Sequence, residues 1–381
     1  MHILEIPSFF PPYGGEFCLE QAKALKALGH EVRILSNVQL GATINLRWYL
    51  SLPYRRFEHE CDGITIYQSY QRGLPKLIRY NVRRWVHIVC SMFDDYVERY
   101  GNPDILHAHC AKWAGYAAMK IGKDYKIPYV VTEHLSKQVF EIEFASSDTW
   151  QISLLKEAYR NADCVVPVAE ELVDSIACYF GKDYRWKSIS NVIDTDFYHY
   201  QERQPKAGRT FRFCCLANNW PLKGYDILIP AFEQLRANGA DAVLYIAGRG
   251  TDTEEFRKNL SDGIVSYGLV SREKVRDLLF QCDALVLASR SEVQPLVLLE
   301  AMSTGIPVIS TECIPQNLRI EGGCTIVPID NPQALAVAMK QVMEISNYDG
   351  MGVSEHVCRL ASPGVVGRKL SELFSEILFS A

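Results

Sequence analysis

Short apolar runs alternate with segments of helical periodicity along the first half of the chain. The first run is 2–6, and a breaker sequence rich in proline and glycine follows at 11–15. Apolar residues then recur at helical spacing from Cys18 to Leu28, and Gly29 suits the position just after a helix. Further strands are predicted at 31–35, 104–107, 129–132 and 164–168. This alternation favours a parallel sheet covered by helices on both faces.

The second half of the chain repeats the pattern, with strands predicted at 211–216, 242–247, 264–267, 284–288 and 307–310. The polar segment 201–208 is rich in breakers and predicts a linker between two domains. We therefore expect an α/β protein of two Rossmann-like, doubly wound domains, 1–204 and 205–362, followed by a helical segment at 363–381. In this architecture ligands bind in a cleft at the carboxyl ends of the strands.

Length and composition agree with a two-domain globular protein. The chain has 381 residues, against a usual size of roughly 150 residues per domain. Apolar residues make up 48% and charged residues 22%, and a net charge of −5 gives no sign of a nucleic-acid partner. The opening run lacks the basic start and long apolar stretch of a signal peptide, so a cytoplasmic protein is expected.

Cysteine and histidine are the residue types in this sequence that could ligate a metal. None of the twelve cysteines forms a Cys-x-x-Cys pair, and reduced, buried thiols are the preferred interpretation. His107 and His109 share one predicted strand, where a metal pair is conceivable. We find no carboxylate or further histidine at ligand spacing beside them in the sequence, so no metal site is expected.

The strongest chemical signal is the segment 291–302, which lies between two predicted strands. Glu292 is predicted in the turn after the first of them, and Glu300 inside the helix that follows. Pro295 suits the first helical turn. Backbone amides at the start of this helix form a site suited to a diphosphate, and those expected to contribute belong to Val293, Gln294, Leu296 and Val297.

The two glutamates suggest different partners. A carboxylate at Glu292 would repel phosphate, so it is better suited to accept hydrogen bonds from sugar hydroxyls. Glu300, flanked by apolar residues within the helix, suits a ribose diol. The alternative is that Glu292 only complements the helix dipole and Glu300 is a surface charge.

The spacing of Glu292 and Glu300 resembles the Glu-x7-Glu motif of the large retaining glycosyltransferase group of the GT-B fold, known as family four or group one. Other segments of this chain resemble landmarks of that family in the same order. They are 12–15 (PYGG), 28–32 (LGHEV), 103–109 (PDILHAH), 132–134 (TEH), 191–197 (NVIDTDF), 222–226 (LKGYD), 247–250 (AGRG) and 267–270 (YGLV).

The resemblance implies transfer of a sugar from a nucleoside diphosphate sugar to an acceptor hydroxyl with retention, as in the synthesis of surface polysaccharides or glycolipids. It implies that 363–381 crosses back onto the first domain, and that 205–362 binds the donor. No metal or other cofactor is implied. The implied roles are Gly14 and Gly15 approaching the diphosphate, Lys223 neutralising it, Leu269 near the base, Glu300 on the ribose, Glu292 on the transferred sugar and His134 facing that sugar.

Three departures from the family pattern stand out. Val293-Gln294-Pro295 replaces a frequent Gly-Phe-Gly, Asn218 replaces an arginine, and Glu312-Cys313 replaces a frequent Gly-Gly. Two other classes remain open, a GT-B sugar-nucleotide epimerase and a non-catalytic sugar-binding protein. The epimerase would use the same donor cleft but needs acid and base groups rather than an acceptor site. The binding protein would need no lysine at a phosphate and would normally carry an export signal.

Basic and aromatic residues are mixed in 46–57 and 72–100. Such a mixture can dock on an anionic membrane surface, and the acceptor could then be lipid-linked. The alternative is a helix packed on the first domain with a solvated basic edge.

Overall fold

The structure is a computed structural model of the chain, and it describes all residues except 12–13, 42–45, 52–54, 145–148, 204–207 and 381. The chain divides into two compact units. The first unit comprises Met1–Val192 with Pro363–Ala381, and the second comprises Ile193–Ser362. Each unit is an α/β domain built around one sheet.

The sheet of the first unit has the strand order β3-β4-β2-β1-β5-β6-β7. Its strands are parallel except β3, which runs antiparallel to β4. The bounds are β1 His2–Pro7, β2 Glu31–Gly41, β3 Phe57–Cys61, β4 Ile64–Gly73, β5 Ile105–His109, β6 Tyr129–Glu133 and β7 Cys164–Pro167.

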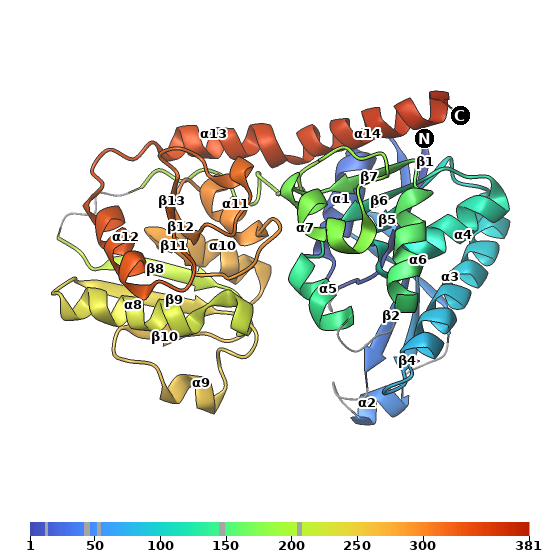
Figure 1. Cartoon of the computed structure of the whole chain (residues 1–381). Coiled ribbons are helices and arrows are strands. Elements are labelled where there is room, and N and C mark those ends of the chain that lie inside the picture. The colour runs from blue at the N-terminus through green and yellow to red at the C-terminus, as the bar shows by residue number, and fades with distance from the viewer. Residues whose placement is uncertain (12–13, 42–45, 52–54, 145–148, 204–207, 381) are drawn as a thin grey trace. The chain divides into compact units, whose positions relative to one another are not determined.

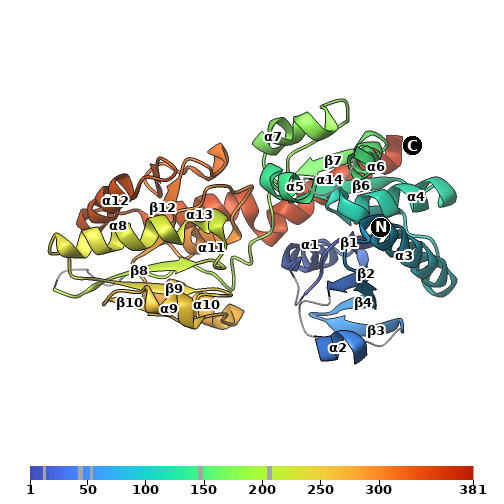
Figure 2. The ribbon, with the colours of Figure 1, turned by 60° about the horizontal axis from the view of Figure 1, so that its bottom comes forward.

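Helices cover both faces of this sheet. Their bounds are α1 Glu16–Ala27, α2 Leu46–Ser51, α3 Ile78–Tyr100, α4 Tyr116–Tyr125, α5 Lys137–Phe144, α6 Thr149–Arg160, α7 Glu171–Phe180 and α14 Pro363–Ser380. Apolar side chains of α1 and α14 pack together with those of the strands in one buried cluster. Helix α3 lies on the other side of the strands from α1 (Figure 2).

The second unit has a six-stranded parallel sheet in the order β10-β9-β8-β11-β12-β13. Its strands are β8 Phe211–Leu216, β9 Ala242–Ala247, β10 Ile264–Ser266, β11 Ala284–Leu287, β12 Val308–Thr311 and β13 Cys324–Val327. Its helices are α8 Tyr225–Ala237, α9 Glu254–Lys258, α10 Arg272–Gln281, α11 Leu296–Ser303, α12 Pro332–Glu344 and α13 Gly350–Ala361.

Alternating side chains of β8 enter two different cores. Phe213 and Cys215 pack with α8 and α12 on one face of the sheet. Cys214 and Leu216 pack with α10, α11 and α13 on the other face. This two-sided burial explains why 213–216 is a continuous apolar run, with the exposed Arg212 only near the start of the strand. Figure 1 shows α8 and α12 together on their face of the sheet.

Most predicted strands are found, and three strands were missed. They are the β3–β4 hairpin and β13. Asp62 and Gly63 connect β3 to β4, and both have positive φ, of 49° and 76°. An Asp-Gly pair between extended segments is a strong hairpin signal that the sequence prediction did not use.

The predicted domain boundary at 204/205 falls on 204–207, outside the described residues. The structure instead divides the chain after Val192. Segment 193–201 belongs to the second unit because the Ile193 amide donates to the Ala361 carbonyl and the Gln201 amide donates to the Thr304 carbonyl. Helix α14 belongs to the first unit, where it packs against α1.

Across the part of the chain that the structure describes, no helix combines the length and the apolar character needed to span a bilayer.

Candidate functional site

The loops that carry Lys223 and Glu292 leave two adjacent strands of the second sheet. The chain runs from β8 outward through β9 and β10, then returns to β11 on the other side of β8. This reversal is a topological switch point, where open parallel sheets bind their ligands. Lys223 follows β8, and Glu292 follows β11.

A pocket of about 320 Å³ lies at the carboxyl ends of strands β8, β9 and β11. Six of the residues predicted from the sequence line it: Asn218, Lys223, Leu269, Leu296, Val297 and Glu300. Glu292, Val293 and Gln294 are not among its lining residues, and Gln294 is buried. The remaining wall is largely apolar and includes Leu216, Ala247, Val270, Val275 and Leu287.

Lys223 and Glu292 form an ion pair beside the pocket. The Lys223 ammonium lies 2.7 Å from Glu292 Oε1, which also accepts a hydrogen bond of 2.6 Å from Ser289 Oγ. The Glu292 side chain is only 8% exposed and that of Lys223 24%. The ammonium of Lys223 therefore neutralises the negative charge by which Glu292 would repel a phosphate.

The backbones of these two loops also meet. Gly224 has φ of +68°, and a Cβ there would lie 2.0 Å from the carbonyl oxygen of Ala288. A side chain at this position would therefore force the turn Pro221–Lys223 away from the end of β11. The glycine of the Lys-Gly pair is thus required for the loops to touch.

Helix α11 begins at Leu296, one residue later than the sequence predicted. Pro295 is its N-cap, with extended backbone, rather than part of the first helical turn. The amides of Leu296 and Val297 belong to the first turn, whose N–H groups have no partner within a helix. Both residues line the pocket, so this helix presents donors and the positive end of its dipole there.

Glu300 lines the pocket from about one turn inside α11, next to the buried Tyr198. Burial raises the pKa of the Tyr198 hydroxyl, and the neighbouring carboxylate of Glu300 raises it further. Arg272 lies over the Tyr198 ring and pairs with Asp194 at 3.1 Å. Tyr198 thus connects Glu300 to the ion pair of Arg272 and Asp194.

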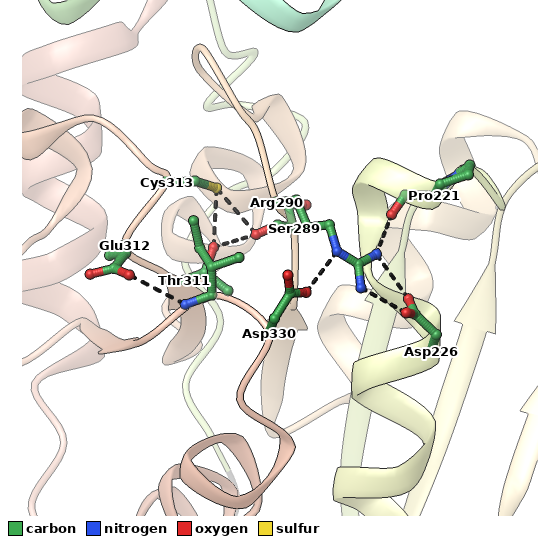
Figure 3. A network of polar contacts seen from close by, with 9 residues as sticks. Pro221, Asp226, Ser289, Arg290, Thr311, Glu312, Cys313 and Asp330 are labelled. Atoms are coloured by element: carbon green, nitrogen blue, oxygen red, sulfur yellow. Dashed lines mark hydrogen bonds and ion pairs between the residues drawn. The ribbon is translucent and has the colours of Figure 1, made fainter.

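The structure also locates the residues that depart from the family pattern. Asn218 Oδ1 accepts the Arg249 backbone N–H at 2.8 Å and so links the loops after β8 and β9. Cys313 does not line the pocket. It lies behind the Glu292 loop, where its thiol donates to the Ser289 carbonyl at 3.4 Å (Figure 3). Glu312 accepts from the Ile329 amide at 3.4 Å, so both residues of this pair have structural contacts.

The predicted residues of the first unit lie in loops after β1 and β6. Gly14 and Gly15 connect β1 to α1. Gly15 has φ of +88°, and a Cβ there would lie 2.2 Å from the Phe9 carbonyl oxygen, so this loop folds tightly on itself. His134 follows β6, and its ring stacks on Phe17 of α1 with the ring centroids 3.6 Å apart.

A buried chain of side chains supports His134. Glu5 Oε2 is 2.7 Å from His109 Nε2, and His109 Nδ1 is 3.3 Å from His134 Nε2. Burial alone would raise the pKa of Glu5, but His107 and His109 outweigh it and lower that pKa to about 2. Burial lowers the pKa of His109. The Glu5 carboxylate is therefore held in its ionised form between the two imidazoles.

This cluster corrects the expectation that no carboxylate accompanies the two histidines. Glu5 lies on β1, which pairs with β5, and its carboxylate reaches His107 as well as His109. Glu5, His107 and His109 are residue types that hold divalent metals. Their closest atoms are 2.7 and 2.8 Å apart, a hydrogen-bonding separation shorter than the roughly 3.3 Å between tetrahedral zinc ligands.

Glu133 stabilises the loop that carries His134 through hydrogen bonds to the backbone. It is fully buried and accepts hydrogen bonds from the amides of Ala111, His134 and Leu135 and from the Tyr159 hydroxyl. Burial raises the pKa of Glu133, while these donors act in the opposite direction. Glu5, His109 and Glu133 were missed as supports of the site, although polar residues inside apolar strands were visible in the sequence.

The sequence contains one Asp-x-Asp, Asp194-Thr195-Asp196, and such pairs can hold a diphosphate-bound metal. Asp194 already has other partners, since it pairs with Arg272 and accepts a hydrogen bond from the Phe197 amide at 3.1 Å.

All twelve cysteines, each of which lies within the described residues, are free thiols.

Helix α3, which lies within the basic and aromatic segment 72–100, is packed along one face and exposed along the other. Trp85 is fully buried, and its indole N–H donates to the Asn37 carbonyl. Arg79 and Arg83 lie over the Trp150 ring at 5.4 and 5.9 Å. Thus α3 is a packed helix with a basic edge, and the part of 46–57 at 52–54 lies outside the described residues.

Comparison with known families agrees with the two units. Residues 14–197 match the model described as Glycosyltransferase Family 4, and residues 210–344 match Glycosyl transferases group 1. The chain belongs to the group 1 glycosyltransferases. The glycosyltransferase is therefore an enzyme of the GT-B fold, as its motifs and its two doubly wound sheets predicted.

Two similar proteins align with 82% and 97% of this glycosyltransferase. The putative teichuronic acid biosynthesis glycosyltransferase TuaC of Bacillus subtilis is 26% identical over 82% of this chain and 81% of its own. The putative colanic acid biosynthesis glycosyltransferase WcaL of Salmonella typhimurium is 25% identical over 97% and 98%.

Solved structures share the fold. Sucrose-phosphate synthase from Thermosynechococcus elongatus matches with a TM-score of 0.79 and 17% identity, covering 100% of both chains. Anabaena HepE in complex with UDP matches with a TM-score of 0.72 and 16% identity, covering 99% of this chain and 100% of its own.

Proposed function

We propose that this glycosyltransferase takes a sugar from a nucleoside diphosphate sugar and transfers it to a hydroxyl of a growing glycan. The observation that carries the proposal is the pocket of the second unit. It combines the Lys223 ammonium, the first amides of α11 and the Glu300 carboxylate. Cations and helix amides suit a diphosphate, and a carboxylate suits the two hydroxyls of a ribose. The apolar side chain of Leu269 suits a nucleobase.

The names of similar proteins support the same substrate class. HepE was solved with UDP, and TuaC and WcaL are named for the biosynthesis of polysaccharides. Surface polysaccharide or glycolipid synthesis is therefore the process we propose. The nucleobase, the sugar and the acceptor stay open.

The Lys223–Glu292 pair suits the departure of a diphosphate. A lysine has three N–H donors, and Glu292 engages one of them, so two remain for phosphate oxygens. Negative charge grows on the diphosphate as the sugar leaves, and a fixed cation stabilises that charge most in the transition state. For Glu292 we propose the role of accepting a hydrogen bond from a hydroxyl of the transferred sugar.

We propose retention of configuration, on the resemblance to the retaining group. The departing diphosphate takes the acceptor proton while the acceptor hydroxyl attacks the same face, so no protein nucleophile is needed. In the first unit, His134 is the candidate contact for the sugar, and the loop with Gly14 and Gly15 is the candidate for the diphosphate. We also propose that the reaction needs no metal and occurs in the cytoplasm, with peripheral membrane contact through 46–57 and 72–100.

Incubating the pure protein with a panel of nucleotide-sugars tests this function. Slow hydrolysis of one donor, accelerated by a suitable glycan acceptor, is expected. Release of an epimeric sugar would identify an epimerase, and an unchanged donor that nevertheless binds would identify a sugar-binding protein. A thermal-shift screen with UDP, ADP and GDP finds the base first, because a ligand that binds only the folded state raises the melting temperature.

A further inference from the structure

The guanidinium of Arg290 joins three segments of the second unit. Its Nη2 donates to Asp226 Oδ2 at 2.7 Å, and its Nη1 donates to Asp226 Oδ1 at 3.0 Å and to the Pro221 carbonyl at 2.5 Å. Its Nε donates to Asp330 Oδ1 at 2.7 Å. Figure 3 shows the guanidinium between these partners, with Asp226 on α8.

These contacts connect the two loops that carry the ion pair. Pro221 begins the short turn that presents Lys223, and Arg290 precedes Glu292 by two residues. The Arg290 backbone N–H also donates to the Leu222 carbonyl at 2.8 Å. Arg290 does not line the pocket, so it acts on the site through these loops.

The other side of the Glu292 loop is held independently. The Thr311 hydroxyl donates to the Ser289 carbonyl at 2.5 Å, and the Cys313 thiol approaches the same oxygen. The loop is thus held at Ser289 by Thr311 and Cys313, and at Arg290 by Pro221, Asp226 and Asp330 (Figure 3).

The chemistry of Arg290 favours a rigid connection. The hydrogen bonds to Asp226, then those to Asp330, raise its pKa, so the group stays charged. A planar guanidinium with two parallel bonds to a carboxylate fixes direction as well as distance, which a lysine cannot reproduce.

We infer that Arg290 is a positioning residue that sets the placement of Lys223 and Glu292 for the donor diphosphate. This inference rests on the proposed function. Small displacements of a reacting group cost a large part of the rate, so the rigidity of this connection matters to turnover.

The same unit contains a matched control. Arg209 makes a bidentate pair with Asp283, with contacts of 2.8 and 2.6 Å. These residues precede β8 and β11, so the pair joins the same two strands at their opposite ends. The Arg209 side chain is 32% exposed and that of Arg290 26%. Asp283 is 4% exposed and Asp226 64%, so removing Arg209 leaves the more buried carboxylate unpaired. An effect that came from lost stability alone should therefore be at least as large for Arg209 as for Arg290.

The first test needs no substrate. The rate at which acetic anhydride modifies Lys223 is measured by peptide mass spectrometry, with the exposed Lys340 as internal reference. Arg290→Gln is expected to speed modification of Lys223 by about three-fold or more, because the held ion pair shields the amine. Arg209→Gln should leave the rate unchanged. Equal rates in wild type and Arg290→Gln would overturn the inference.

The second test is a double-mutant cycle in donor turnover. Arg290→Gln is expected to lower kcat/KM by about ten-fold in the wild-type background. In a Lys223→Ala background its further effect should fall below about two-fold, because residues that act through one another are not additive. Arg209→Gln should have the same small effect in both backgrounds.

The outcomes separate the two proposals. If Arg290→Gln costs the same with and without Lys223, Arg290 does not act through the lysine and the inference is wrong. If wild type turns over no nucleotide-sugar, the proposed function fails, and the modification rate of Lys223 still decides whether Arg290 holds the ion pair.

Discussion

The ammonium of Lys223 lies 2.7 Å from the carboxylate of Glu292, although 69 residues separate them in the chain. The pairing follows from the strand order, because Lys223 comes after β8 and Glu292 after the neighbouring β11. It places a lysine and a nearly buried carboxylate beside a pocket of about 320 Å³. In this chain the first glutamate of the Glu-x7-Glu spacing is thus paired with a lysine from another loop.

Removing the lysine should reduce turnover as well as donor affinity. A charge-assisted hydrogen bond contributes roughly 1.5–3 kcal/mol, so Lys223→Ala should lower kcat/KM by about ten- to 150-fold. Adding Asn218→Arg should recover part of the loss, because Asn218 is exposed at the pocket and leaves room for a longer cation. Steady-state kinetics at saturating acceptor decide it, and a change below about three-fold would show that Lys223 does not stabilise the diphosphate.

The two glutamates should differ in what they do to nucleotide binding. Glu300 lines the pocket, so Glu300→Ala should weaken binding of the nucleoside diphosphate by about ten-fold or more. Glu292→Ala should leave that affinity unchanged or higher, since it frees the Lys223 ammonium, and should damage turnover of the sugar donor. Calorimetric titration of both variants with the diphosphate is the measurement. Equal loss of affinity in the two would contradict this division.

Activity should persist when divalent metals are removed. Lys223 and the first amides of α11 are sufficient to stabilise the leaving diphosphate in the proposed mechanism. The rate is measured in excess EDTA, with dialysed enzyme and metal-free donor. Loss of activity that manganese or magnesium restores would show that a metal participates.

The basic edge of α3 is expected to bind anionic lipid. Arg79 and Arg83 are exposed there, and Leu77 and Tyr80 beside them are each 51% exposed. Replacing Arg83 and Arg84 by Glu should reduce co-sedimentation with phosphatidylglycerol vesicles, more at low salt than at high salt. Lys340→Glu with Arg359→Glu changes the same charge on the second unit and is the control. A wild-type protein that does not sediment would limit α3 to its packing role.

The buried histidines should make the first unit acid-sensitive. Burial lowers the pKa of His109, which is fully buried, so its neutral form belongs to the folded state. Its contribution to stability is present above the unfolded pKa of about 6.5 and is lost as pH falls toward the lower folded value. Urea unfolding at a series of pH values below 6.5 is the measurement.

The slope of unfolding free energy against pH should become shallower in His109→Gln by up to about 1.4 kcal/mol per pH unit. His87→Gln, which removes an exposed ring on α3, is the matched control. An unchanged slope in His109→Gln would show that His109 does not take up a proton on unfolding.

Local patterns in the sequence determined much of the fold. The strands β8 and β9 were predicted with the bounds that the structure has, because each is a short apolar run between breakers and both faces of a parallel sheet are buried. The Glu292-x7-Glu300 spacing, the Lys-Gly pair and the turn after β11 were visible for the same reason, since each depends on neighbouring residues. The polar edge hairpin β3–β4 lacked this signal, apart from its Asp-Gly turn.

Only the tertiary structure decided which polar groups meet. Glu5 reaches His109 because β1 pairs with β5, and His109 reaches His134 because β5 pairs with β6. Arg290 contacts Asp226 because β11, which precedes Arg290, lies beside β8, which precedes Asp226. The sequence names these residues, but a hydrogen bond forms over about 3 Å, and the partner at that distance is chosen by how the sheet is assembled rather than by spacing along the chain.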